Sequence, residues 1–273
     1  MKSGEDLLND PIAWGRRLIE TEDHDPLYSG LVRWDVDRNR KRRFLIAYWS
    51  CYSVGASWHL SRHSGVEFWV KMETAAANVV SPAAAGACEL DRWPRAHERR
   101  HWRGQKCVDS VRWLREAYPN PEDAVREVEE LPSPLTLRGV ELAVTRWPQF
   151  GPWIAFKAAD MMERVMGLPV EFPTAITSLY KDPREGGEMM APVLGLPNGQ
   201  VVTEVLLEAY DGMTAPGLHP RTVNVQEVET VLCKWKSARK GKYWIGLDTR
   251  DHRDELERWG ARDLLAAYPN WTP

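Results

Sequence analysis

The sequence predicts a mainly α fold in one compact helical unit, and three observations carry this prediction. Apolar residues recur at the three- and four-residue spacing of helices through much of the chain. Strand-like alternation of apolar and polar residues is scarce. Proline and glycine interrupt the apolar segments where helices would start and stop. With no internal repeat visible, we expect residues 1–273 to form a single domain.

The N-terminal part of the chain predicts helices separated by polar turns. Residues 5–25 indicate a short amphipathic helix followed by an acidic turn. The aromatic and apolar segment Phe44–His63, interrupted by Gly55, has the length of a buried helix. Gly65–Asn78 predicts another helix, and the prolines and small residues of 79–96 predict a loop.

The central part predicts helices on both sides of a tight turn. Apolar residues recur on one side of a helix over Arg99–Tyr118, and Pro119 then stops it. A short acidic helix over 121–130 follows. Leu137–Val144 leads into the turn, and the helix after the turn closes at Gly167.

The C-terminal part predicts an irregular insertion and then helices. Residues 168–200 are rich in proline and glycine, so we expect a long loop at about 168–220. Val201–Tyr210, within that loop, fits either a helix or a strand. Helices are expected from Gln226 through Trp235 and from about Asp251 to Tyr268.

Composition narrows the possible functions. The formal net charge of −3 excludes a uniformly basic nucleic-acid coat but permits a local basic groove. The chain holds 14 tryptophans, some in apolar helical patterns and others beside basic residues, where stacking on nucleic-acid bases is one use. Trp49, Trp69 and Trp113 are expected in the core.

Cysteine usage and the first residues point to a reducing cytoplasm. The four cysteines show neither metal-ligand spacing nor a disulfide framework. The first residues lack the apolar segment of a signal peptide. No apolar run approaches the roughly 20 residues that span a bilayer, so no membrane partner is expected.

The turn before Pro152 has the pattern of a helix-hairpin-helix, at about residues 140–166. Pro152 fits the first turn of a helix, and Gly151 allows another molecule to approach the backbone closely. Free N–H groups at the positive end of a helix dipole suit a phosphate. The segment therefore predicts contact of Gly151, Pro152 and Trp153 with a nucleic-acid backbone. An ordinary helix-loop-helix corner with its aromatic residues in the core is the alternative.

Residues 97–106 combine four cations with a His-Glu-x-x-His pattern. On a helix, His97 and His101 would lie one turn apart, with Glu98 as the base of a zinc peptidase. The crowded cations, the short helix and the lack of an evident third ligand disfavour zinc. An anion site, or a solvated basic helix end, remains, and we expect neither metal nor cofactor. The cations that would bind the anion are Arg99, Arg100, Arg103 and Lys106.

Residues 233–244 interleave five cations with aromatic side chains. This combination suits a nucleic-acid backbone with exposed bases, although a charge run is also typical of a solvated face. The residues predicted to bind DNA here are Lys234, Trp235, Lys236, Lys240 and Lys242.

Four stretches, taken in order, resemble the phage amino acid:DNA transferases, relatives of the α-glutamyl/putrescinyl thymine pyrophosphorylases. They are Phe44–Asn78, Glu98–Gly104, the hairpin of Trp147–Asp160 and Val228–Asp248, and the resemblance covers roughly residues 20–260. The hairpin also resembles that of DNA glycosylases. In glycosylases an Asp after the hairpin does the excision chemistry, and Gly167–Pro173 holds no Asp at that place.

The resemblance implies chemistry on a modified base in phage DNA. The partner would be DNA carrying 5-hydroxymethyluracil that a separate DNA kinase has phosphorylated. An amine, here a free amino acid such as glycine or serine, would displace phosphate or pyrophosphate. Flipping the base out of the stack would help such chemistry. The product would shield phage DNA from host nucleases.

The resemblance also implies roles for individual residues. Arg99, Arg100, His101 and Arg103 would stabilise the anionic leaving group. Asp160 and Glu98 are candidates to take a proton from the amine. Lys157 and Asp160 lie three apart, so a helix puts them on one face. The residues expected to bind substrate are Lys71, Asn78, Lys106, Lys157 and Asp248.

Other classes of function remain open at this point. A DNA glycosylase or lyase would leave an abasic product instead of a heavier base. A non-catalytic DNA-binding module would need neither the carboxylates nor the second basic cluster. A zinc hydrolase would depend on His97 and His101.

Overall fold

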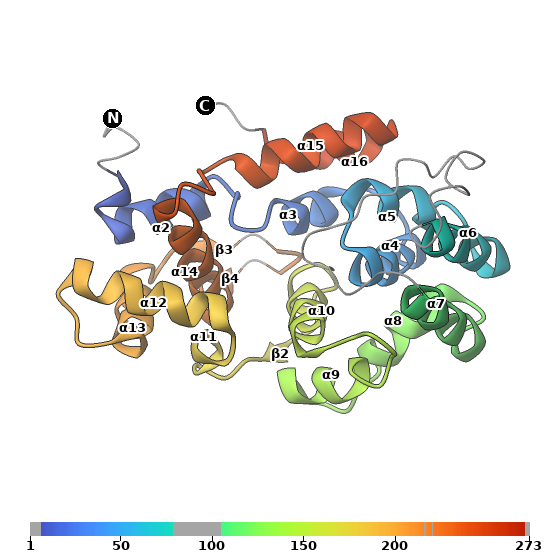
Figure 1. The fold of residues 1–273 in the computed structure, drawn as a ribbon, viewed down its shortest axis with the longest axis horizontal. Coiled ribbons are helices and arrows are strands. Elements are labelled where there is room, and N and C mark those ends of the chain that lie inside the picture. The colour runs from blue at the N-terminus through green and yellow to red at the C-terminus, as the bar shows by residue number, and fades with distance from the viewer. Residues whose placement is uncertain (1–6, 79–104, 216, 220, 271–273) are drawn as a thin grey trace.

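A computed structural model describes residues 7–78, 105–215, 217–219 and 221–270, and it confirms a mainly helical unit (Figure 1). Two short two-stranded sheets accompany the helices. The helices are α2 (Pro11–Glu20), α3 (Pro26–Arg33), α4 (Arg38–Cys51), α5 (Val54–Ser61), α6 (Gly65–Asn78), α7 (Gln105–Ala117), α8 (Pro121–Glu129), α9 (Leu137–Val144), α10 (Pro152–Arg164), α11 (Ile176–Leu179), α12 (Lys181–Leu194), α13 (Gly199–Ala209), α14 (Val225–Arg239), α15 (Leu247–Trp259) and α16 (Arg262–Ala267).

The strands are short and add little to the core. β1 (Leu135–Thr136) pairs in parallel with β2 (Val170–Glu171). β3 (Thr214–Ala215) pairs antiparallel with β4 (Arg221–Thr222).

Side-chain caps fix several helix starts. Asp10, Asp37, Ser53 and Thr136 each accept a hydrogen bond from a backbone N–H in the first turn of the helix that follows. Asn224 forms a capping box with Glu227 at the start of α14. These local signals explain why the helical reading of the sequence succeeds.

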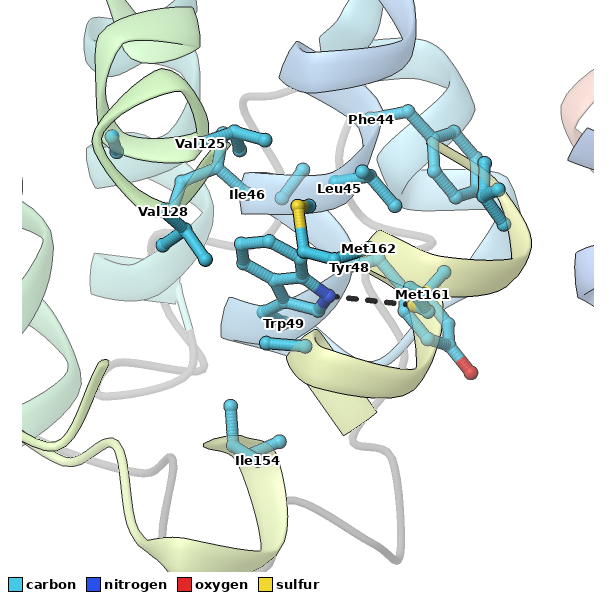
Figure 2. Packing of buried hydrophobic residues seen from close by; sticks show 14 of the residues in the cluster. Phe44, Leu45, Ile46, Tyr48, Trp49, Val125, Val128, Ile154, Met161 and Met162 are labelled. Atoms are coloured by element: carbon cyan, nitrogen blue, oxygen red, sulfur yellow. Dashed lines mark hydrogen bonds between the residues drawn. The ribbon is translucent and has the colours of Figure 1, made fainter. Parts of the chain in front are cut away.

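The first hydrophobic cluster surrounds the tryptophan of α4. Trp49 is fully buried, and its indole N–H donates to the Met161 sulfur at 3.4 Å. Figure 2 shows this ring between Val125 and Val128 of α8 and the methionines of α10. Residues of α3 to α10, α15 and α16 contribute to the cluster. The expected burial of Trp49 and Trp69 is confirmed, whereas Trp113 is 37% exposed and does not belong to the core.

The second hydrophobic cluster packs α2, α12, α13 and α14 together. Its largest members are Trp14, Tyr210 and Trp235, all buried. α12 lies directly against α14, where a Cβ on Gly186 would meet the Leu232 carbonyl oxygen at 2.2 Å. Glycine is therefore required there by close helix packing.

The predicted long loop at 168–220 is wrong, because α11, α12 and α13 occupy most of it. Gly186, Gly187 and Gly199 serve helix contact, and Pro192 lies inside α12 near the end of that helix. Val201–Tyr210, which fitted helix or strand, belongs to α13.

Two predicted helices are each divided in two. The segment Phe44–His63 breaks at Tyr52, which has a left-handed φ of 55°, and not at Gly55. Gly55 instead lies inside α5, where a Cβ would collide with Trp259. The C-terminal helix breaks at Gly260, with φ of 67°, into α15 and α16.

Among the described helices, none combines the length and hydropathy of a membrane span.

Candidate active site

A cavity of about 510 Å³ lies where the two hydrophobic clusters meet, and we call it the central cavity. α10, near the middle of Figure 1, contributes one wall, and α14 and α15 contribute others. The turn before α3 and the C-terminal end of α4 complete it. Its charged lining consists of five carboxylates and two lysines, namely Asp25, Glu229, Asp248, Asp251, Glu255, Lys157 and Lys234.

One face of α10 carries functional side chains at helical spacing. Trp153 and Lys157 lie one turn apart and line the cavity. Asp160 and Arg164 follow on the same face and are buried. The face therefore runs from the rim of the cavity into the protein interior.

Lys157 is a buried cation held among carboxylates. Its Nζ lies 3.9 Å from Asp25 Oδ1. Burial works to lower the pKa of Lys157, but nearby Asp25, Glu229 and Asp160 raise this pKa above its ordinary value. Lys157 therefore stays protonated at neutral pH and acts as a fixed positive charge.

Asp25 and Glu229 face each other across one hydroxyl. Thr230 Oγ1 lies 3.3 Å from Asp25 Oδ2 and 3.4 Å from Glu229 Oε2. Burial raises the pKa of Glu229, while Lys157 opposes this rise and Asp25 adds to it. The cavity thus holds a carboxyl group that is more basic than an exposed one.

Asp160 belongs to a buried network behind the cavity lining. Burial and the charge of Asp25 raise its pKa to about 7, and its Oδ1 has no hydrogen-bond partner among the described residues. The neighbouring Arg164 donates to Glu227 and lies 3.4 Å from His24 Nε2. Burial and Arg164 lower the pKa of His24 to about 4, so this imidazole is neutral at pH 7.

The turn before α3 is tied to the start of α15 through Asp23. Its carboxylate accepts hydrogen bonds from Gly246 N at 2.6 Å and from Thr249 N at 2.8 Å. Lys234 donates to the Asp23 carbonyl and pairs with Asp248 at 2.7 Å. Burial works to raise the pKa of Asp248, but the charge and the hydrogen bond of Lys234 lower it below its ordinary value. This link fixes the α15 wall of the cavity.

Aromatic rings form the wall beside α4. Tyr48 and Tyr52 stack with ring centroids 4.5 Å apart, and Tyr52 meets Trp153 at 5.0 Å. All three rings line the cavity. Such a wall offers flat apolar surface next to the charged groups.

Neither Cys233 nor Lys157 in the described lining is an activated nucleophile. Burial raises the pKa of the Cys233 thiol to about 12, so it stays protonated. Lys157 is protonated because nearby carboxylates raise its pKa.

The comparison with known proteins decides the family. A family model described as amino acid:DNA transferase matches residues 19–243. The chain belongs to the amino acid:DNA transferase family. It is 36% identical, over 90% of its length and 89% of the relative's, to a glycinyltransferase of Pseudomonas phage PaMx11. It is 24% identical, over 92% of its length and 80% of the relative's, to a putrescinyltransferase of Delftia phage PhiW-14. This chain is thus a transferase of phage-type DNA modification.

The structure brings several predicted residues of the transferase together. Trp153, Lys157, Lys234 and Asp248 all line the central cavity, and Asp160 lies behind Lys157. Lys71 in α6 and the exposed Lys106 in α7 are not part of the cavity lining. Glu98, Arg99, Arg100, His101 and Arg103 lie outside the described residues, as does the side chain of Asn78.

The basic segment of the transferase divides into core and surface. Trp235 is fully buried and donates to the Leu8 carbonyl, so its prediction as a base-stacking residue is wrong. An apolar ring at that helical position fills the second cluster instead. Lys236 is also buried and pairs with Asp182 and Glu185. Lys240 and Lys242 are exposed and remain candidates for DNA contact.

The segment predicted as a helix-hairpin-helix consists of α9, a turn over 145–151, and α10. Gly151 and Pro152 are exposed at the tip, with Pro152 at the first helical position. The left-handed residue of the turn is Gln149, with φ of 68°, whereas Gly151 is extended with φ of −96°. A Cβ at Gly151 would meet nothing within 4 Å, so the fold itself does not require glycine there.

Sequence reasoning missed Asp25, Glu229, Tyr52 and His24. Asp25 lay in a segment that reads as an acidic turn, and it is the N-cap residue of α3 before Pro26. Glu229 lies among apolar and basic residues of α14, and the sequence pattern drew attention to those residues instead. A polar residue on the apolar face of a predicted helix was the available signal.

Proposed function

We propose that this transferase attaches an amino acid, glycine or serine, to phosphorylated 5-hydroxymethyluracil in phage DNA, with displacement of phosphate or pyrophosphate. The amine nitrogen would attack the methylene carbon, and the C–O bond to the leaving group would break. The glycinyltransferase relative supports glycine as donor. A 5-hydroxymethyluracil DNA kinase would supply the substrate, and the reaction would take place in the host cytoplasm.

The observation that carries this proposal is the acid-rich lining of the central cavity. Five carboxylates against two lysines favour a cationic amine over a phosphate. Lys157 or Lys234 would bind the carboxylate of the amino acid. The volume of about 510 Å³ lies within the usual range of small-molecule sites, roughly 300–1,000 Å³.

The aromatic wall supports a flipped base as the second substrate. Tyr48, Tyr52 and Trp153 present stacked or tilted rings beside the carboxylates. Stacking on such rings contributes about 1–3 kcal/mol per base. A base placed there would bring its 5-substituent towards the bound amine.

The leaving group and the DNA backbone would be held by cations outside the cavity. Arg99, Arg100 and Arg103, with His101 and Lys106, carry the donors that a departing phosphate needs. The hairpin at Gly151, Pro152 and Trp153 would hold a DNA phosphate through the N–H groups of Gly151 and Trp153, because proline has no N–H to donate. Lys240 and Lys242 would extend that track. Asp160 and Glu98 remain proposed proton acceptors, and Lys71 and Asn78 proposed substrate contacts.

Mass spectrometry of nucleosides tests the reaction. DNA containing phosphorylated 5-hydroxymethyluracil is incubated with the protein and glycine or serine, with unmodified DNA as control. A nucleoside heavier than thymidine by one amino-acid unit is the expected product. Loss of the base without an adduct would instead indicate a glycosylase. No change with either donor would contradict the proposal.

A substitution in the arginine segment tests the leaving-group site. Arg100→Ala removes one forked donor, so we expect adduct formation to slow by about 10²–10³-fold, the usual cost of losing one such group. Full transfer activity in this variant would exclude the anion site. Arg138→Ala, on the exposed face of α9, is the matched arginine control.

A further inference from the structure

We propose that Glu229 is the catalytic residue that removes the proton from the attacking amine. This assignment rests on the proposed function, and it places the proton transfer on a residue of α14 that lines the central cavity. The argument comes from the bonding state of each carboxylate that the amine could meet.

Four of the five lining carboxylates are already engaged. Asp25 faces Lys157, Asp248 pairs with Lys234, and Asp251 pairs with Arg250. Glu255 Oε1 accepts hydrogen bonds from Ser53 Oγ and from Gly55 N, so the Glu255 carboxylate caps the start of α5. Lys234 lowers the pKa of Asp248, and each of the other three already directs a carboxylate oxygen at a cation or a donor.

Glu229 differs from those four. Within the described part of the chain Glu229 forms no ion pair, and its one side-chain hydrogen bond, from Thr230 Oγ1, is long at 3.4 Å. The side chain is 5% exposed, so it meets the cavity and little bulk water. Glu229 therefore has a carboxylate oxygen available for an ammonium N–H.

The electrostatic surroundings support proton uptake by Glu229. Burial raises its pKa above the ordinary glutamate value, which makes its carboxylate a better base. Lys157 acts in the opposite direction and favours the ionised carboxylate. The charged or titratable groups that act on Glu229 from the packed elements are Lys157, Asp25, Asp182, Tyr180 and Cys233.

Asp160 is a less direct acceptor. It is 1% exposed, and it does not belong to the described lining of the cavity. The charge of Asp160 raises the pKa values of two residues that line the cavity, Lys157 and Tyr28. Asp160 thus fits a positioning residue, which raises the pKa of the neighbouring lysine without touching the amine, so Glu229 takes over the acceptor role proposed above for Asp160.

The step balances without any further reagent. The Glu229 carboxylate takes one proton from the ammonium and becomes a carboxylic acid. The freed nitrogen lone pair forms the C–N bond as the C–O bond to phosphate breaks, and the electron pair leaves with the phosphate. The resulting secondary ammonium then loses its extra proton to solvent. An alkylammonium with a pKa near 10.4 is free amine in only about one part in 2,500 at pH 7.

The test is the pH dependence of glycine transfer in the full chain, with DNA saturating. Glu229→Gln is expected to transfer at least about 100-fold more slowly at pH 7. Its rate should rise about tenfold per pH unit towards the pKa of glycine, because only free amine then reacts. The wild-type rate should level off at lower pH, once Glu229 is ionised. Glu229→Asp should restore part of the rate and the wild-type profile.

Each outcome separates this assignment from the proposed function. Glu116→Gln, an exposed carboxyl on α7, is the control and should keep the wild-type rate and profile. A Glu229→Gln protein with the wild-type profile, even at a reduced rate, overturns the assignment while the transferase proposal stands. A wild-type protein that forms no adduct overturns the proposed function itself.

Discussion

At the scale of single residues, the buried Asp160 makes stability depend on pH. Burial and Asp25 raise its pKa to about 7, against 3.8 when exposed. Between these values the folded protein keeps a proton that the unfolded chain releases. The free energy of unfolding therefore falls as pH rises through this window, by at most about 1.4 kcal/mol per pH unit.

Asp160→Asn tests this prediction by removing the titration. His24 contributes with the opposite sign, because its pKa is lowered to about 4, so the wild-type curve alone mixes the two effects. The difference between variant and wild type isolates Asp160. In urea unfolding at pH 4.5 and pH 7, Asp160→Asn should gain stability relative to wild type at the higher pH. A difference that is constant with pH would contradict the raised pKa.

At the scale of elements, a substitution in the hairpin between α9 and α10 should change DNA affinity without changing the stability of the fold. Gly151 has a negative φ and open space around its Cα, so alanine fits the fold. We expect Gly151→Ala to change the free energy of unfolding by no more than about 1 kcal/mol. A methyl group at a close DNA contact should cost about 1–3 kcal/mol of binding, or roughly 5–150-fold in affinity.

Fluorescence anisotropy with labelled DNA, beside urea unfolding, measures both quantities. Gly139→Ala in α9 is the matched control, because a Cβ there makes ordinary contact and the position lies inside the first helix. Equal DNA affinity for Gly151→Ala and wild type would remove the hairpin tip from the DNA interface.

The turn between α14 and α15 supports a second prediction at this scale. Lys240 and Lys242 are exposed there, whereas Lys236 is buried in ion pairs with α12. If both exposed lysines contact phosphates, Lys240→Ala/Lys242→Ala should lower the slope of log affinity against log salt by about 2. A salt titration of DNA binding measures the slope. Lys181→Ala, an exposed lysine of α12, should leave it unchanged, and an unchanged slope in the double variant would exclude the phosphate contacts.

At the scale of the whole molecule, local features could be predicted from the sequence and long-range ones could not. Helix caps and helical spacing are properties of a few neighbouring residues, which is why the α10 face with Lys157 and Asp160 was predictable. The meeting of Lys157 with Asp25 and Glu229 depends on how three distant elements pack. Gly186 and Trp235 show the same limit. The residues around Gly186 suggested a loop and those around Trp235 suggested a DNA contact, whereas packing buries both.

The position of the central cavity between the two hydrophobic clusters leads to a prediction about the whole chain. α14 belongs largely to one cluster, whereas α10, α4 and α15 belong to the other. A donor bound there contacts both, so it should stabilise the protein as one unit. Glycine at 100 times its Kd should add about 2.7 kcal/mol to the free energy of unfolding, which raises Tm by roughly 5–10 °C.

Scanning calorimetry with glycine and with acetate checks this stabilisation. Acetate supplies the carboxylate without the amine, so it should shift Tm much less than glycine does at the same concentration. Lys157→Gln should reduce the glycine effect, because it removes a cation proposed to bind the glycine carboxylate, and the charge of that cation also lowers the pKa of Glu229. Equal shifts with acetate and glycine would show that the acidic lining does not recognise the ammonium. If the protein unfolds in two separate transitions and glycine raises the Tm of only one, the donor binds within one hydrophobic cluster and not between the two.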